Sequence, residues 1–146
     1  MEGSLRIHIS KQAYETYKIQ KDNESKLFPQ YSDMFFWCVV LGYKSSPDKV
    51  PANIGTDRSG TIWWNAFEEE IQKPLLKAIC VKAAGTFNIL SPDPTTKGFE
   101  KFRDILQSYA ELGFSVLNTR LGGNYSNDNL NKLMDILLEY TEVKIV

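Results

Sequence analysis

Histidine is almost absent from this sequence. The 146 residues include one histidine, His8, and two cysteines, Cys38 and Cys80. A serine- or cysteine-based catalytic triad needs a base, and only His8 is available for that role. One histidine and two cysteines also fall short of a four-ligand zinc site and lack its CxxC or HxxxH spacing. We therefore expect no triad and no metal centre, and we expect both cysteines to be buried thiols.

Nucleotide-binding signatures are lacking as well. Neither GxxxxGK[ST] nor GxGxxG occurs, and the glycine pair in LGGNYS has no lysine beside it to cradle phosphates. The three consecutive glutamates at 68–70 lie around one predicted helix and do not converge on a substrate atom. The sequence thus predicts a protein that is not an enzyme and binds no cofactor. A hidden hydrolase built on His8 or a cysteine is a weaker alternative.

Long apolar runs and an excess of one charge are also missing. The longest uncharged apolar run, at 34–42, is far shorter than the roughly 20 residues of a membrane-spanning helix. Seventeen basic and 18 acidic residues give a net charge of −1, so no overall positive field attracts nucleic acid or lipid. The N-terminus has no signal-peptide pattern. We expect a cytoplasmic protein without a membrane segment.

The chain has the composition of an ordinary globular protein, with 42% hydrophobic and 24% charged residues. Its length fits one core, so we predict a single compact domain over residues 1–146. Alternation at 5–10 predicts a strand, and helical spacing of apolar residues recurs along the rest of the chain. Further short strands are expected at 61–64 and 143–146, and residues 87–90 are expected to form either a short strand or a hydrophobic connector. The predicted fold is an α-rich α+β domain of about five helices with a few short strands.

Glycine and capping residues predict where these helices begin and end. Gly42, Gly85 and Gly113 each follow an apolar helical pattern and are expected to end a helix. Pro74 indicates a new helix or a kink. The residues from 35 to 41 are apolar around most of the helix, which predicts a helix in the middle of the core. The predicted N-caps are Ser10, Ser32 or Asp33, Thr95 or Thr96, and Asn127 or Asp128.

A turn-rich segment at 44–61 predicts a long surface loop, and loops of this length are often functional. It leads into the sequence IWWN. Strand alternation places one of these two tryptophan rings inward and one outward, although both could serve the core. Bulky aromatic side chains anchor many protein interfaces. The candidate partner-binding residues are therefore Trp63, Trp64, Lys49 and Arg58.

Basic residues near the N-terminus support a second hypothesis. Arg6 and His8 on the polar side of the strand, with Lys11 and Lys18 on the next helix, can form a strip facing phosphate groups. A strand followed by two helices is also the order of ribbon-helix-helix proteins, in which paired strands of a dimer enter the major groove. The alternative function is thus a small DNA-binding or transcription-regulating module.

Four segments in a fixed order carry a family resemblance: LFPQYSDMFFWCVVLGYK, GTIWWNAF, LLKAICVKAAGTFNIL and FEKFRDILQSYAELGFSVL. Over roughly residues 27–120, the chain resembles small accessory proteins encoded beside bacterial DNA phosphorothioation (Dnd) and related anti-phage systems. The positions that carry this resemblance are Phe28, Asp33, Leu41, Gly42, Tyr43, Trp63, Phe67, Ile89, Leu90, Tyr109, Ala110, Glu111 and Gly113.

The resemblance implies a non-enzymatic accessory subunit of a defence complex. Its partner would be a larger nuclease, ATPase or modification enzyme, contacted through residues 44–64. DNA would be reached directly or through that partner. The insert SSPDKVPANIGTDRSG stands where a shorter basic segment is expected, and this favours a protein contact over direct DNA binding.

Overall fold

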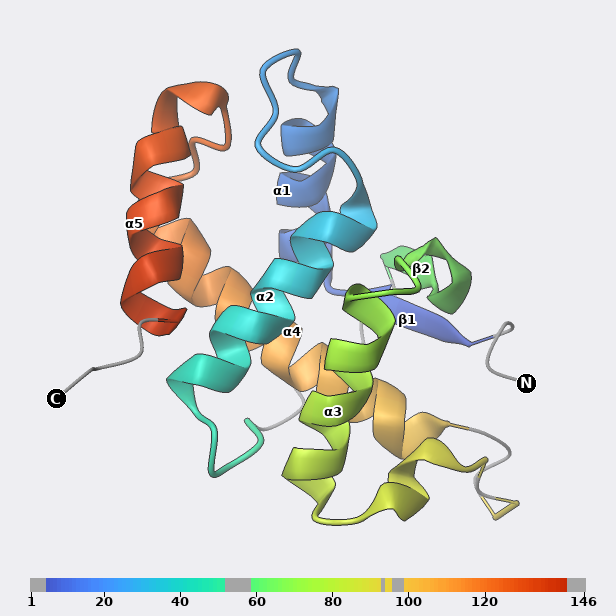
Figure 1. Ribbon diagram of the computed structural model, residues 1–146. Coiled ribbons are helices and arrows are strands. Elements are labelled where there is room, and N and C mark those ends of the chain that lie inside the picture. Colours follow the sequence, from blue (N-terminus) through green and yellow to red (C-terminus); the bar gives the residue numbers. More distant parts are fainter. Residues whose placement is uncertain (1–4, 52–58, 93, 96–98, 142–146) are drawn as a thin grey trace, which may run out of the picture.

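Two long helices cross at the centre of the protein. The computed structural model describes residues 5–51, 59–92, 94–95 and 99–141 (Figure 1). Helix α2 spans Tyr31–Ser45 and α4 spans Glu100–Leu121, and these two helices make the most extensive contact between elements. The helices packed around them are α1 (Lys11–Asp22), α3 (Gln72–Ala84) and α5 (Leu130–Thr141).

A two-stranded antiparallel sheet packs against α4. Its strands are β1 (Arg6–Ile9) and β2 (Gly60–Trp63). The inner face of the sheet is buried, because alternate side chains of both strands point into the core: Ile7, Ile9 and Ile62. The predicted strands at 5–10 and 61–64 are thereby confirmed, and so is the α-rich α+β class. None of the described helices is both long and apolar enough to cross a membrane.

Gly42 and Gly113 lie inside helices, at the point where α2 and α4 cross. A Cβ on Gly42 would stand 2.0 Å from the backbone oxygen of Tyr109, and one on Gly113 would stand 1.7 Å from the backbone oxygen of Cys38. The prediction that these two glycines end helices is wrong. Here glycine allows two backbones to pack closely, and both helices continue beyond it.

Other glycines do end helices. Gly85 has a φ of 73° and ends α3, as predicted, and Gly122 has a φ of 60° and ends α4. Pro74 stands in the first turn of α3, which is the predicted new helix, because its missing N–H is tolerated there.

Only one of the predicted N-caps is confirmed. Ser10 Oγ accepts the N–H of Ala13 at 3.3 Å and caps α1. Helix α2 begins one residue before Ser32, and Asp33 in its first turn accepts the N–H of Gln30 at 3.1 Å. The caps predicted for the last two helices are also wrong, since Phe99 precedes α4 and a 3-10 turn over Asn127–Asn129 leads into α5. Thr96 lies outside the described residues.

The remaining short segments differ from the predictions in part. Residues 87–90 form a 3-10 helix (Phe87–Leu90) and no strand, because Thr86 Oγ accepts the N–H of Asn88 at 3.1 Å and starts a helical turn. A further 3-10 turn spans Trp64–Ala66. The predicted surface loop begins after Ser45 and ends before β2, and its residues 52–58 lie outside the described part. The strand expected at 143–146 lies outside it as well.

Candidate functional site

The outer face of the sheet brings Arg6 and Trp63 together. The two residues are directly opposite each other in the antiparallel register. The Arg6 guanidinium carbon lies 4.5 Å from the centroid of the Trp63 ring, which is within the range of a cation–π contact. Trp63 is 46% exposed and Arg6 is exposed as well. A cation and an indole ring therefore meet on an open surface.

The same face carries a second cross-strand pair, His8 and Thr61. His8 is half-buried and Thr61 is exposed. We call Arg6, His8, Thr61 and Trp63 the sheet face. In Figure 1 it belongs to the two strands at the right of the molecule. Sequence analysis assigned Arg6 and His8 to DNA binding and Trp63 to protein binding, whereas the structure places all three on one surface. Thr61 was missed, although strand alternation already grouped it with Trp63.

Side chains of α4 accept hydrogen bonds from the edge of β1 that faces away from β2. The His8 N–H donates to Gln107 Oε1 at 2.7 Å, and the Ser10 N–H donates to Glu111 Oε1 at 3.4 Å. The other edge of β1 is paired with β2 of the same chain. These two bonds disfavour the ribbon-helix-helix arrangement, because side chains of α4 occupy two amides of the edge that would pair with a strand from a second copy.

Trp64 lies in the core behind the sheet face. It is 2% exposed, and its ring centroid lies 5.3 Å from that of Phe102 and 5.5 Å from that of Phe67. The predicted alternation of one inward and one outward tryptophan is thus observed. Because its ring is buried, Trp64 is not available to bind a partner. It packs behind the strand that presents Trp63.

The other candidate residues do not gather at the sheet face. Lys49 is exposed on the turn after α2, in a small hollow with Lys82 and Tyr109. This turn lies on the far side of α3 from β2 in Figure 1. Lys11 and Lys18 are exposed on α1, where a spacing of seven residues puts them on one side of the helix. Arg58 lies outside the described residues.

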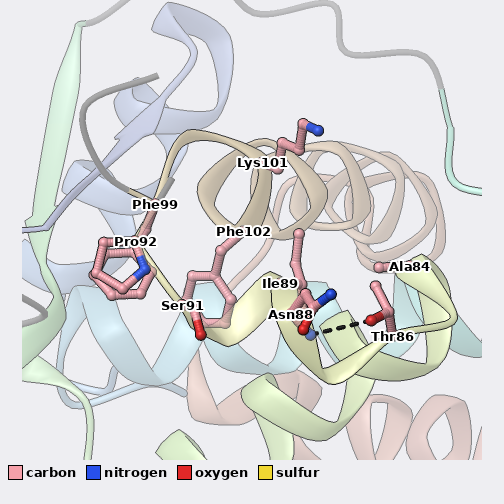
Figure 2. A pocket seen from close by; sticks show the side chains of 9 residues that line it. All are labelled: Ala84, Thr86, Asn88, Ile89, Ser91, Pro92, Phe99, Lys101 and Phe102. Atoms are coloured by element: carbon pink, nitrogen blue, oxygen red, sulfur yellow. Dashed lines mark hydrogen bonds between the residues drawn. The ribbon is translucent and has the colours of Figure 1, made fainter. Parts of the chain in front are cut away.

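A second candidate site is a hollow between the end of α3 and the start of α4 (Figure 2). Its volume is about 440 Å³, which is within the range of small-molecule sites. Phe99 and Phe102 form its apolar wall, and Lys101 extends away from the other lining side chains. The remaining lining residues are small, polar or aliphatic: Ala84, Thr86, Asn88, Ile89, Ser91 and Pro92.

Both thiols lie in the core, as predicted, and neither forms a disulfide. Burial raises the pKa of Cys38 to about 12 and that of Cys80 well above its ordinary value. Each sulfur therefore stays protonated at neutral pH and is a poor nucleophile. Among the residues that the structure describes, no group of three His, Cys, Asp or Glu side chains could hold a metal ion.

The fold is that of a small compact α-rich α+β protein with an aromatic core, and the sheet face is its candidate site. Over residues 6–144 the chain matches the family described as DNA sulphur modification system-associated protein 4, and it belongs to that family. The resemblance to Dnd-associated proteins is thereby confirmed. No curated protein and no solved structure matches the chain.

Proposed function

We propose that this chain is a non-enzymatic accessory subunit of a bacterial DNA-modification or anti-phage defence complex. The sheet face docks it onto a larger nuclease, ATPase or modification enzyme. The family association with a DNA sulphur modification system supports the setting. The observation that carries the proposal is the exposed contact between Arg6 and Trp63. Arginine and tryptophan are the residue types that most often dominate interface energies.

The support beneath the sheet face favours binding. The inner face of the sheet is part of the core, and Trp64 fixes the end of β2 by its contacts with Phe67 and Phe102. The cation–π contact favours one arrangement of Arg6 and Trp63 before a partner arrives. Side chains ordered in advance lose less entropy on binding, and the interface gains affinity.

The state of the buried nucleophiles supports the non-enzymatic part of the proposal. Cys38 and Cys80 are enclosed in the core, and burial raises the pKa of both thiols. A thiolate at neutral pH needs the opposite environment, one that is electropositive and partly exposed.

The proposal is tested by co-expressing the chain with the proteins encoded beside its gene and purifying the complex by size exclusion. We expect the wild-type chain to be retained by one of these larger proteins. The double variant R6A/W63A should reduce retention at least about tenfold, because it removes both anchors.

Phe87→Ala is the matched control, since Phe87 is 77% exposed and lies on the 3-10 helix before α4. This variant should be retained like the wild type. Two results would contradict the proposal: a wild-type chain that is never retained, or an equal loss for the control and for the double variant.

DNA binding is the second candidate function. The positions of Arg6 and His8 on the sheet face, and of Lys11 and Lys18 on one side of α1, favour it. Because phosphate contacts release counterions, such binding should weaken steeply with added salt. A mobility-shift assay at low salt should then show a complex that Lys18→Ala weakens, whereas the same variant should leave protein retention unchanged. The absence of a complex at low salt would rule this candidate out.

A further inference from the structure

The sheet has an open edge on the side of β2 that faces away from β1. In an antiparallel pair of strands, hydrogen-bonded and non-hydrogen-bonded positions alternate. The Trp64 N–H donates to the Leu5 carbonyl oxygen at 3.0 Å, so this position is hydrogen-bonded. The next position, Trp63, is therefore not bonded to β1, and by the same alternation neither is Thr61. The backbone N–H and C=O groups of these two residues point away from β1.

The opposite strand shows the same alternation. His8 lies across from Thr61, and its N–H points outward and donates to Gln107 of α4 at 2.7 Å. The outer edge of β1 is thus bonded to a helix. In the part of the chain that the structure describes, the outward backbone groups of Thr61 and Trp63 have no hydrogen-bond partner. Both residues are exposed. A strand edge with unpaired backbone groups is a template for another strand.

Arg6 offers a charge beside this edge. Its guanidinium carbon lies 4.5 Å from the centroid of the Trp63 ring. Stacking on a ring engages the flat face of a guanidinium, whereas its N–H donors lie in the plane and can still bond another group. No ion pair is found for Arg6 among the described residues. A carboxylate fits these donors with two parallel hydrogen bonds. The edge and the unpaired cation together indicate an acidic, extended chain.

We propose that the open edge of β2 takes an extended segment of the partner protein as a third strand. This segment carries aspartate or glutamate beside Trp63, where the carboxylate pairs with Arg6. Backbone bonds to Thr61 and Trp63 fix the register of the segment, and its alternate side chains lie on the sheet face. The chain turns into a 3-10 helix at Trp64, so the paired stretch is short and Arg6 and Trp63 are its anchors. This inference rests on the proposed function, because it names what docks at the sheet face.

The chemistry of the edge argues against two other occupants. The edge presents both donors and acceptors, whereas a DNA backbone presents phosphate and sugar oxygens that only accept. The outward C=O groups of Thr61 and Trp63 would find no donor there. A second copy that paired through β2 would bring the sequence GTIW, which contains no acid. Arg6 of both copies would then stay without a carboxylate.

The test measures amide hydrogen exchange residue by residue in the full chain, alone and in the complex with the proteins encoded beside its gene. We expect the N–H groups of Thr61 and Trp63 to exchange rapidly in the free chain and at least about tenfold more slowly in the complex. Ile62 is the control. Its N–H faces Ile7 at a hydrogen-bonded position of the β1–β2 ladder, so it should exchange slowly in both samples.

A pair of variants at position 61 separates the backbone from the side chain. Thr61→Pro removes one outward N–H, and proline is tolerated on an edge strand where the N–H faces solvent. It should lower retention by the partner about fivefold, because a backbone bond is lost. Thr61→Val keeps the N–H and should be retained like the wild type. Thermal unfolding checks that both variants fold, and the exchange measurement on the wild type needs neither of them.

A charge exchange tests the carboxylate. A photoreactive benzophenone amino acid at position 61 locates the bound segment by crosslinking. Arg6→Glu should lower retention about tenfold, because it places like charges together. Changing the acid of the crosslinked segment to lysine should restore retention of Arg6→Glu.

Several results would overturn the inference. These are unprotected Thr61 and Trp63 amides in a complex that retains the chain, their protection in the chain alone at raised concentration, and their protection by a DNA duplex. Equal retention of the two position-61 variants, a crosslinked segment without an acid, or no rescue of Arg6→Glu would do the same. If R6A/W63A reduces retention while these amides stay unprotected, the inference alone fails. If no neighbouring protein retains the wild-type chain, the proposed function fails with it.

Discussion

Gly113 in α4 packs directly against the backbone carbonyl of Cys38 in α2. A Cβ at Gly113 would stand 1.7 Å from that oxygen, a separation that real Cβ atoms essentially never show. The contact is matched by Gly42, whose Cβ would meet the carbonyl oxygen of Tyr109 at 2.0 Å. The two longest helices can therefore cross closely only because two side chains are missing.

Gly113→Ala should strongly destabilise the protein. The added methyl group meets backbone atoms of α2, which cannot move aside without shifting the whole helix. We expect the free energy of unfolding to fall by about 3 kcal/mol or more, measured by urea denaturation. Gly122→Ala is the control, since nothing lies within 4 Å of a Cβ there and only its positive φ is strained. It should cost about 1–2 kcal/mol. Equal losses for the two variants would contradict the close crossing.

These glycines show what the sequence could and could not predict. Apolar periodicity located the helices, because the core-facing stripe is a local pattern. It did not distinguish Gly42 and Gly113 from Gly85, which ends a helix as predicted. Whether a glycine ends a helix or admits a neighbouring backbone depends on a partner helix far away in the chain. The order of residues along one helix contains no such information.

Gln20→Leu should destabilise the connection between α1 and α2. Gln20 is 1% exposed, and its side chain satisfies both backbone groups of Phe28: Oε1 accepts the N–H at 2.7 Å, and Nε2 donates to the carbonyl oxygen at 3.1 Å. Leucine leaves both groups buried without partners, so we expect a loss of about 3 kcal/mol in urea denaturation. Gln20→Glu keeps the acceptor and should also destabilise the protein, because it loses the donor. A Gln20→Leu variant as stable as the wild type would show that water replaces these bonds.

Glu68→Gln should lower stability in a pH-dependent way. The Glu68 carboxylate accepts the N–H of Ile71 at 2.8 Å and also bonds those of Glu70 and Gln72, ahead of α3. The Ile71 bond is the largest cause that lowers the pKa of Glu68. A lowered folded-state pKa means that the carboxylate stabilises the fold above its unfolded pKa of about 4.3, and that this contribution is lost as pH falls through the folded value.

The measurement for Glu68 is thermal unfolding at pH 7 and pH 3. We expect the melting temperature of Glu68→Gln to lie below that of the wild type at pH 7, with the difference reduced at pH 3. Glu70→Gln is the control. The Glu70 side chain is exposed, and only the backbone N–H of this residue takes part in the turn. A pH-independent difference would show that the carboxylate charge is not what stabilises this helix start.

The candidate site was predictable only in part. Alternation along IWWN separated the inward Trp64 from the outward Trp63, because a strand reverses side with each residue. The contact between Arg6 and Trp63 requires the register of β1 against β2, which is set by long-range packing. The bond from the edge of β1 to Gln107 was missed for the same reason. The open edge of β2 could not be recognised either, since the alternation of its hydrogen bonds depends on that register.

Cys38 and Cys80 should resist thiol reagents until the protein unfolds. Both are fully buried, and burial raises the pKa of Cys38 to about 12. At pH 8 in native buffer we expect labelling by a chromogenic disulfide to be slow, and to accelerate across the urea unfolding transition. Gly113→Ala should accelerate it under native conditions, because a less stable fold opens more often. Since these thiols keep their protons in the folded state, the free energy of unfolding should also fall as pH rises above the unfolded thiol value of about 8.5. Rapid labelling of either cysteine in native wild-type protein would place that thiol outside the core.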